Sequence, residues 1–101
     1  MVARVRTHPG EVLREEFMKP LGLSANALAL ALRVPATRIG DILRDDKPRA
    51  VSADTAMRLA RYFGTTAQFW LNLQCAYDLS IAERESGAEI ERDVQPREAV
   101  A

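Results

Sequence analysis

The stretch over residues 23–46, LSANALALALRVPATRIGDILRDD, decides how the rest of this 101-residue chain is organised. Ser24 is a good helix cap ahead of an apolar run. Pro35 excludes Val34 from the helical region, so a first helix must end there. Pro35 then suits the first turn of a second helix over residues 36–44. Two short helices joined by a tight turn form a helix-turn-helix, a motif whose second helix enters the DNA major groove.

The composition predicts a single small domain that folds without covalent cross-links. A chain of this length buries roughly two-thirds of its unfolded surface, and 48% of its residues are hydrophobic. One cysteine excludes an internal disulfide and fits a reducing cytoplasm. No apolar run approaches the roughly 20 residues that a membrane span needs, and the first residues lack the apolar core of a secretion signal. We therefore expect a cytoplasmic protein without a membrane partner.

The zero net charge hides an asymmetry along the chain. Residues 1–64 carry 11 Lys and Arg against 7 Asp and Glu, whereas residues 65–101 carry 3 against 7. A basic front half and an acidic back half indicate two partners, or else a solvated surface on which like charges cluster by chance.

One helix is predicted ahead of the motif. Thr7 or His8 supplies its cap, Pro9 fits its first turn, and Pro20 and Gly22 end it. His8 is the only histidine in the sequence. Because no acidic or cysteine residue stands at a ligand or triad spacing from it, we expect His8 to be a cap or a surface residue.

Two helices are predicted after the motif. Ser52 caps the first, which ends at Gly64 because glycine takes the left-handed conformation without strain. Thr65 or Thr66 caps the last and longest helix, on which Cys75 is expected to be a small packed residue. The apolar face of this helix is wider than one small core needs, which favours a dimer interface where aromatic residues are enriched. The expected interface residues are Phe69, Trp70, Leu73 and Tyr77.

The chain is thus expected to have three parts. Residues 1–7 form a flexible N-terminal arm, and residues 8–85 form the helix-turn-helix domain with its motif at 24–45. Residues 86–101 lose the apolar pattern and are interpreted as a disordered acidic tail that orders on a partner.

The segments HPGEVL near the start and SADTAMRLARYFGTTAQFWLNLQ further on resemble the HigA (also VapI) family of antitoxins, within the phage-repressor-like (Cro/C1 or XRE) helix-turn-helix proteins. The resemblance covers residues 8 to about 79. It implies an all-α, five-helix, lambda-repressor-like domain that dimerises, represses its own operon and binds a small ribonuclease toxin of the HigB (RelE-like) class. One departure is Arg33, which stands where glycine is common because the position tends to be left-handed.

Carrying the motif over residue by residue places base contacts at the exposed start of the second helix. Arg38 is the expected guanine reader, because its fork bonds both acceptors of that base. Asp41 either accepts from a cytosine amine or steers Arg38. The expected base-contacting residues are Ala36, Thr37, Arg38 and Asp41, and the expected phosphate-contacting residues are Ser24, Asn26, Arg33, Arg44, Lys47 and Arg49.

Two features of the charge pattern shape the expected partners. Aspartates near the second helix weaken the basic patch, so useful affinity requires a homodimer that reads two half-sites about one DNA turn apart. A basic toxin would be met by an acidic surface, which chiefly speeds encounter. That surface consists of Glu83, Glu85, Glu89, Glu91 and Asp93 or, alternatively, of Glu11, Glu15 and Glu16.

Three other functions stay open from the sequence alone. An enzyme requires a nucleophile–base pair, a metal cluster or a carboxylate dyad, and none is found, so no catalytic residue, metal or cofactor is predicted. A stand-alone transcriptional repressor without a toxin partner would use the same DNA contacts. A helical interaction module that no longer binds DNA is favoured only by Asp41, Asp45 and Asp46 beside the second helix.

Overall fold

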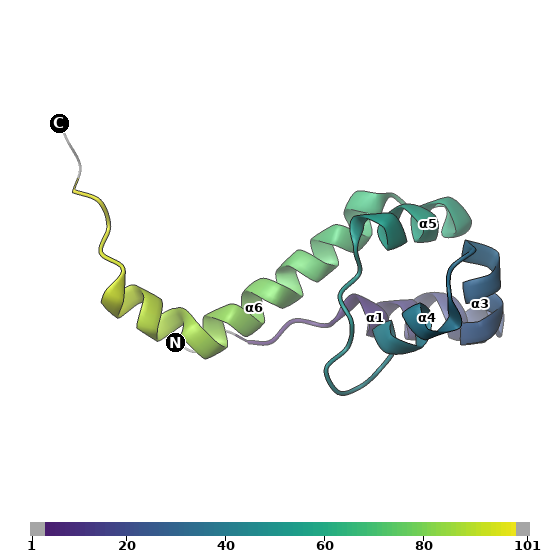
Figure 1. Ribbon diagram of the computed structural model, residues 1–101, viewed down its shortest axis with the longest axis horizontal. Coiled ribbons are helices and arrows are strands. Elements are labelled where there is room, and N and C mark those ends of the chain that lie inside the picture. The colour runs from purple at the N-terminus through teal and green to yellow at the C-terminus, as the bar shows by residue number, and fades with distance from the viewer. Residues whose placement is uncertain (1–3, 99–101) are drawn as a thin grey trace.

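Helices make up all the regular structure of residues 4–98, which are the residues that the computed structural model describes (Figure 1). The first helical unit is continuous over α1 (Pro9–Val12), the π-helical segment η1 (Leu13–Met18) and α2 (Lys19–Leu21). The other four units are α3 (Ala25–Leu32), α4 (Ala36–Ile42), α5 (Ala53–Phe63) and α6 (Ala67–Asp93). The expected all-α fold with five helical units is thus confirmed.

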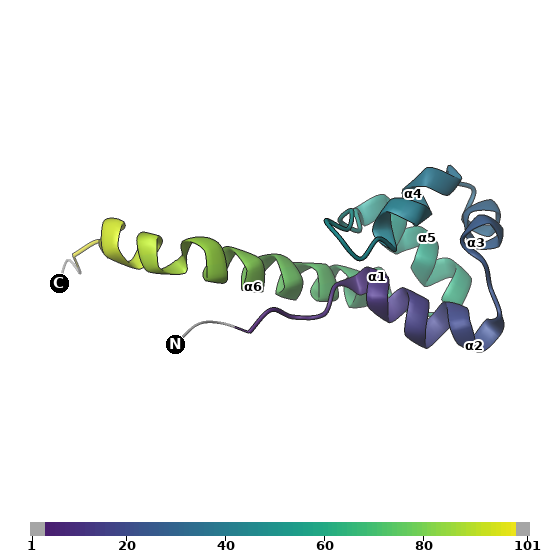
Figure 2. The same ribbon diagram turned by 90° about the horizontal axis from the view of Figure 1, so that it is seen from below.

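Helix α6 gives the molecule its elongated outline of 55 × 29 × 22 Å. Its first half packs against α5 and α1, and its second half projects away from the body that the other helices form (Figures 1 and 2). The chain before α1 runs beside α6 (Figure 2), where the amide of Arg6 donates to Ser80 Oγ at 2.9 Å. Residues 4–7 of the expected arm therefore lie against this helix. Residues 1–3 of that arm, and 99–101 of the expected tail, fall outside the described residues.

A single apolar core joins the helices. Every helical unit contributes at least one side chain that is fully buried, and Trp70 of α6 is the largest of them. The loop before α5 is fastened to the same core, because the buried amide of Val51 donates to Gln74 Oε1 at 2.7 Å. The fully buried apolar side chains include Leu13, Leu28, Ile39, Ile42, Ala56, Leu59 and Trp70.

The predicted helix ends are mostly confirmed by their capping contacts. Four N-cap side chains each accept a hydrogen bond from a backbone N–H in the first turn, which satisfies a group that the helix leaves unpaired. Helix α4 has no such bond, because its N-cap is Pro35, which therefore precedes the first turn rather than lying in it as predicted. Gly22 and Gly64 end their helices in the left-handed conformation, with φ of 60° and 73°. The side chains that cap are His8, Ser24, Ser52 and Thr66.

Pro20 does not end the first helical unit, contrary to the prediction. The preceding segment η1 already departs from α-helical pairing, since the Lys19 amide donates to the Arg14 carbonyl, five residues back. A proline lacks the N–H that an α-helix would require at its position, and this shift of register accommodates it. The unit therefore continues through Leu21 and ends at Gly22.

Helix α6 is longer than predicted, because residues 86–93 are helical rather than part of a disordered tail. Half of this eight-residue segment, namely Ala88, Glu89, Glu91 and Arg92, consists of good helix formers. The absence of an apolar stripe in this segment reflects the absence of packing against the core, and it does not prevent the segment from being helical. On the same helix Cys75 is exposed, so its expected place among packed residues is wrong.

Gly10 marks the closest approach between the first helical unit and α4. A Cβ at this buried position would overlap the backbone carbonyl of Ile42, which cannot move aside as a side chain can. We expect Gly10→Ala to lower the free energy of unfolding by about 1–3 kcal/mol, measured by urea denaturation. The matched control is Gly40→Ala, because a Cβ at this helical position meets nothing within 4 Å. That control should raise stability by up to about 1 kcal/mol, and equal losses in both variants would contradict the close approach.

His8 is a buried cap rather than a surface residue. Its Nδ1 accepts from the Gly10 amide at 2.9 Å, and its ring meets the ring of Tyr77 edge-on with centroids 4.8 Å apart. Burial lowers the pKa of the imidazole, an effect that the charge of Asp78 partly opposes. Because Nδ1 accepts only when it carries no proton, the cap requires the neutral ring.

The stability of the protein should therefore depend on the protonation of His8. The folded-state pKa lies below the unfolded value of about 6.5, so this stabilisation is complete above that pH and is lost as the pH falls through the folded pKa. Between pH 7.5 and 5.5, we expect the melting temperature of the wild type to fall more than that of His8→Asn, whose amide caps without titrating. Parallel melting curves for the two proteins would contradict this role.

Candidate nucleic-acid interface

The start of α4 faces solvent, as the sequence predicts for a helix that reads a DNA groove. Ala36 and Thr37 are exposed, and the side chain of Arg38 is 27% exposed. The opposite face of the helix, with Ile39 and Ile42, is buried in the core. The helix is thereby held against the body while its first turn stays open.

Arg38 is held by a carboxylate that sequence reasoning did not assign to it. Its Nη1 donates to Oδ2 of Asp54 at 2.8 Å, in the first turn of α5. The same oxygen accepts from Nε of Arg58 at 2.9 Å. Hydrogen bonds from Arg58 and then from Arg38 lower the pKa of Asp54. The carboxylate that holds Arg38 in this structure is therefore that of Asp54, so of the two roles considered for Asp41, steering Arg38 is not the one seen here.

The turn between α3 and α4 is left-handed at Arg33, with φ 61° and ψ 45°. The Arg33 amide donates to the Leu30 carbonyl at 3.2 Å and the Val34 amide to the Ala29 carbonyl at 3.0 Å. These two bonds satisfy carbonyls at the end of α3, in the pattern that usually carries glycine. The exposed Arg33 side chain thus lies in the turn before α4, and its left-handed backbone is strained because a residue with a Cβ disfavours that conformation.

Replacing Arg33 with glycine should change thermal stability and DNA affinity in opposite directions. Arg33→Gly removes a left-handed strain of roughly 1–2 kcal/mol, of which the extra flexibility of glycine offsets about 0.5–1 kcal/mol. We expect a small rise in melting temperature. The same change should weaken binding to any duplex and reduce the salt dependence, because it removes a charge that is predicted to contact phosphate. Arg33→Lys is the control, since it keeps both the charge and the strain; a change in stability there would count against this explanation.

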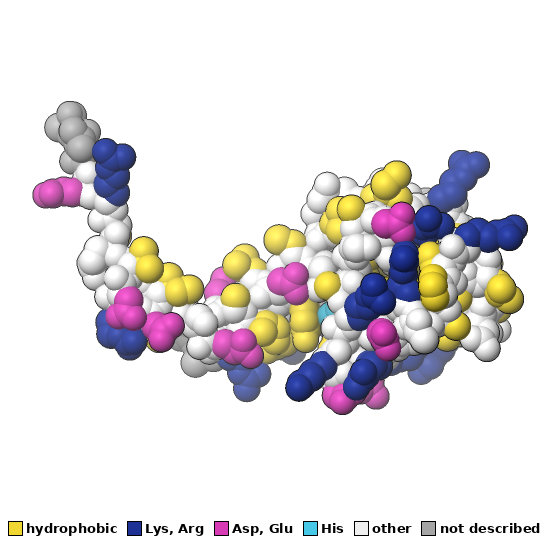
Figure 3. Space-filling model, viewed as in Figure 1, with side chains coloured by type: hydrophobic (Ala, Val, Ile, Leu, Met, Phe, Trp, Pro, Cys, Tyr) yellow, Lys and Arg dark blue, Asp and Glu magenta, His cyan; other side chains and the backbone are white. Residues whose placement is uncertain are grey.

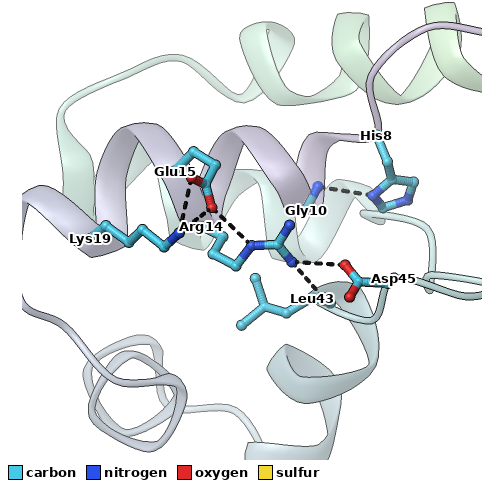
Figure 4. A network of polar contacts seen from close by, with 7 residues as sticks. All are labelled: His8, Gly10, Arg14, Glu15, Lys19, Leu43 and Asp45. Carbon is cyan, nitrogen blue, oxygen red and sulfur yellow. Dashed lines mark hydrogen bonds and ion pairs between the residues drawn. The ribbon is translucent and has the colours of Figure 1, made fainter.

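The far end of α4 is held by the first helical unit (Figure 4). Arg14 Nη1 donates to the Leu43 carbonyl at 3.0 Å and lies 3.4 Å from Asp45 Oδ1, while Arg14 Nε donates to Glu15 at 3.1 Å. Glu15 also pairs with Lys19 at 2.8 Å, and these two cations, Lys19 first, lower its pKa. Together with the close approach at Gly10, Arg14 keeps the end of α4 from shifting.

The predicted phosphate-contacting residues are all exposed. Arg and Lys side chains are concentrated on the body of the molecule, away from the projecting half of α6, with acidic side chains among them (Figure 3). Ser24 Oγ accepts from the Ala27 amide, which leaves its own proton free to donate. Arg44 pairs with Asp46 at 3.4 Å, an exposed ion pair that is weak enough to exchange for a phosphate. The other members are Asn26, Arg33, Lys47 and Arg49.

The predicted dimer residues on α6 are largely occupied within their own chain. Trp70 is 0% exposed and its Nε1 donates to Thr65 Oγ1 at 2.8 Å, so its side chain is not available to a partner and that assignment is wrong. Leu73 packs against the core, and Tyr77 contacts His8. Phe69, whose ring meets that of Trp70, remains 38% exposed.

The structure shows neither a metal site nor a membrane span among the residues it describes. Within residues 4–98 no group of three or more His, Cys, Asp and Glu residues is placed to hold a metal ion. None of the helices in that range combines the length and the apolar character needed to cross a bilayer.

Comparison with known proteins places the chain in a family. A family profile described as helix-turn-helix matches residues 15–70. Virulence-associated protein I of Dichelobacter nodosus is 60% identical over 78 residues, which are 77% of this chain and 70% of that protein.

Solved structures agree with that placement. An addiction module antidote protein of the HigA family from Coxiella burnetii has 48% identity and a TM-score of 0.84, covering 92% of this chain and 99% of its own. The antitoxin HigA of Pseudomonas aeruginosa, solved with the higBA promoter, has 48% identity and a TM-score of 0.85, covering 90% and 97%. Both of these solved relatives are HigA proteins, and the second was solved with promoter DNA. The chain belongs to the HigA family of helix-turn-helix antitoxins.

Proposed function

We propose that this chain is the antitoxin of a type II toxin–antitoxin module, a cytoplasmic homodimer that binds operator DNA and represses its own operon. The observation that carries the proposal is the outward-facing first turn of α4, held at both ends and surrounded by exposed basic side chains. The P. aeruginosa relative that was solved with promoter DNA supports it. Ala36, Thr37, Arg38 and Asp41 read base edges, and the basic residues around them contact phosphates.

Binding to the promoter of its own gene tests this function directly. The purified protein is titrated into a labelled promoter fragment and into a scrambled duplex of equal length, at low and at moderate salt. Specific binding predicts tighter association with the promoter, with a ratio that falls less with salt than either affinity does. Equal binding to the two duplexes would contradict the proposed operator binding and would favour a helical interaction module.

The homodimer forms through an apolar stripe on the outer side of α6, rather than through Trp70. Leu71, Cys75, Leu79 and Ala82 recur at helical spacing and line a shallow apolar groove. Leu79 is 58% exposed in the single chain. Light scattering at micromolar concentration should give the mass of two chains, and Leu79→Glu should give the mass of one. A wild-type mass of one chain would defeat this part of the proposal.

The proposed toxin partner is a small ribonuclease of the HigB (RelE-like) class, met by the acidic outer half of α6. Glu83, Glu85, Glu89 and Glu91 are exposed there. The alternative acidic face on the first helical unit is partly neutralised, since Glu15 already pairs with Lys19 and Arg14. Replacing the four α6 glutamates with glutamine should slow association with the toxin, whereas Glu11→Gln with Glu16→Gln should not.

A stand-alone repressor remains the second candidate, because it would use the same DNA contacts. Co-expression with the neighbouring gene separates the two. Co-purification of a small basic product, together with loss of its ribonuclease activity in the complex, supports the antitoxin. An intact operator affinity with no partner among the neighbouring gene products supports the stand-alone repressor.

A further inference from the structure

We infer that Asp54 is a positioning residue for sequence recognition, which holds the guanidinium of Arg38 in the orientation that reads a base, while Arg58 holds Asp54. This inference rests on the proposed operator binding. It concerns two residues of α5, which is not part of the helix-turn-helix motif itself. The contacts that carry it are Arg38 Nη1 to Asp54 Oδ2 at 2.8 Å and Arg58 Nε to the same oxygen at 2.9 Å.

The geometry leaves Arg38 able to recognise a base while it stays bound to Asp54. A guanidinium carries five N–H donors in a planar fork, and the hydrogen bond to Asp54 uses Nη1. The remaining donors are free to meet the two acceptors that guanine presents in the major groove. Holding a long side chain in place beforehand reduces the conformational entropy that binding would otherwise cost. Asp54 therefore preorganises the guanidinium of Arg38 for binding in the DNA major groove.

Arg58 connects this pair to the turn of the motif. Besides Asp54, it donates through Nη1 to the Leu32 carbonyl at 2.8 Å. Leu32 is the last residue of α3, so one guanidinium joins the start of α5 to the end of α3. Arg58, while bound to Asp54, therefore also ties this carboxylate to the end of α3, next to the turn that leads into α4. Two arginines around one carboxylate also keep the local charge positive, which suits a surface beside phosphates.

A purely structural role for Asp54 predicts different behaviour. Its side chain is 57% exposed, and exposed ion pairs contribute little to folding stability. If Asp54 were only a link between helices, its loss would lower stability slightly and affect all DNA sequences alike. If it positions Arg38, its loss lowers discrimination between sequences, and only while Arg38 is present.

The experiment is a double-mutant cycle on sequence discrimination. Wild type, Asp54→Ala, Arg38→Ala and the double variant are titrated with the promoter fragment and with the scrambled duplex. We expect Asp54→Ala to lower the promoter-to-scrambled affinity ratio on the order of 10-fold, within the range of one base contact, without weakening binding to the scrambled duplex. In the Arg38→Ala background, Asp54→Ala should change the ratio no further.

Two variants control for charge and for hydrogen bonding. Asp46→Ala removes the same charge near α4, where Asp46 pairs with Arg44 and not with Arg38, so its ratio should match the wild type. Asp54→Asn should recover part of the missing discrimination, because its amide oxygen still accepts from Arg38. If Asp54→Ala melts below the assay temperature, Asp54→Ser replaces it, since its hydroxyl suits the first turn of a helix but is too short to hold Arg38.

The outcomes distinguish this inference from the function on which it rests. A wild type that does not discriminate between promoter and scrambled duplex defeats the proposed function. A wild type that discriminates, with an unchanged ratio in Asp54→Ala, overturns the inference alone. An equal fall of the ratio in the Arg38→Ala background also overturns it, because Asp54 would then act without Arg38.

Discussion

Arg38→Ala should weaken binding to the promoter fragment by about 2–6 kcal/mol, because the proposed dimer would present Arg38 to two half-sites and each bidentate base contact contributes roughly 1–3 kcal/mol. The side chain lies at the open first turn of α4 and is hydrogen-bonded to Asp54, so the substitution removes the proposed base-reading side chain in its held orientation. The effect should appear as faster dissociation in a fluorescence or surface-binding assay. Folding should change little, because the ion pair is partly exposed.

The control for this prediction is Arg44→Ala, which removes an equal charge just beyond the other end of α4. Because Arg44 is expected to meet phosphate, its removal should weaken the promoter and the scrambled duplex similarly and should reduce the salt dependence. Arg38→Ala should instead act mainly on the promoter. If the two variants behave alike on both duplexes, Arg38 contacts phosphate, and the base reader is then Thr37 or Asp41.

Trp70→Ala should lower the free energy of unfolding by about 3–5 kcal/mol, the usual range for truncating a large buried aromatic side chain. Trp70 is 0% exposed, packs beside Phe17 and Phe69, and donates a hydrogen bond to Thr65. Domains of this size have total stabilities of roughly 5–15 kcal/mol, so the variant should lose a large share of the free energy of unfolding. Urea denaturation followed by circular dichroism measures the change.

Phe69→Ala is the comparison variant. The side chain of Phe69 is 38% exposed, so its truncation should lower the free energy of unfolding much less than that of Trp70. Both variants are measured at several protein concentrations, since the stability of a dimer depends on concentration. A Trp70→Ala protein that is as stable as the wild type but has the mass of one chain would contradict the core position and restore Trp70 to the interface.

The sequence predicts those features of the fold that depend on neighbouring residues. Ser24, Ser52 and Thr66 cap helices because each hydroxyl reaches an amide three residues on. Gly22 and Gly64 end helices because the left-handed conformation is local to one residue. The inward face of α4 follows from helical spacing alone. Such features involve few alternatives, so a pattern in the sequence determines them.

Features that depend on residues distant in sequence escape such patterns. The pair of Arg38 and Asp54 spans 16 positions, and only the packing of α4 near α5 brings the two together. The spacing of four between Asp54 and Arg58 is the one signal of a charge pair that the sequence offers there. The interface prediction for Trp70 is wrong for the same reason, because periodicity identifies an apolar face without telling what covers it.

Helix α6 has two halves of very different attachment. Its first half shares the core through Trp70 and Gln74, whereas residues 88–93 are exposed on every side in the single chain. Backbone hydrogen bonds without tertiary packing open by local fraying, whereas those of the core open only when the whole domain unfolds. We therefore expect the outer turns of α6 to open independently of the core, so that a partner bound there could change their helix content while the rest of the domain keeps its structure.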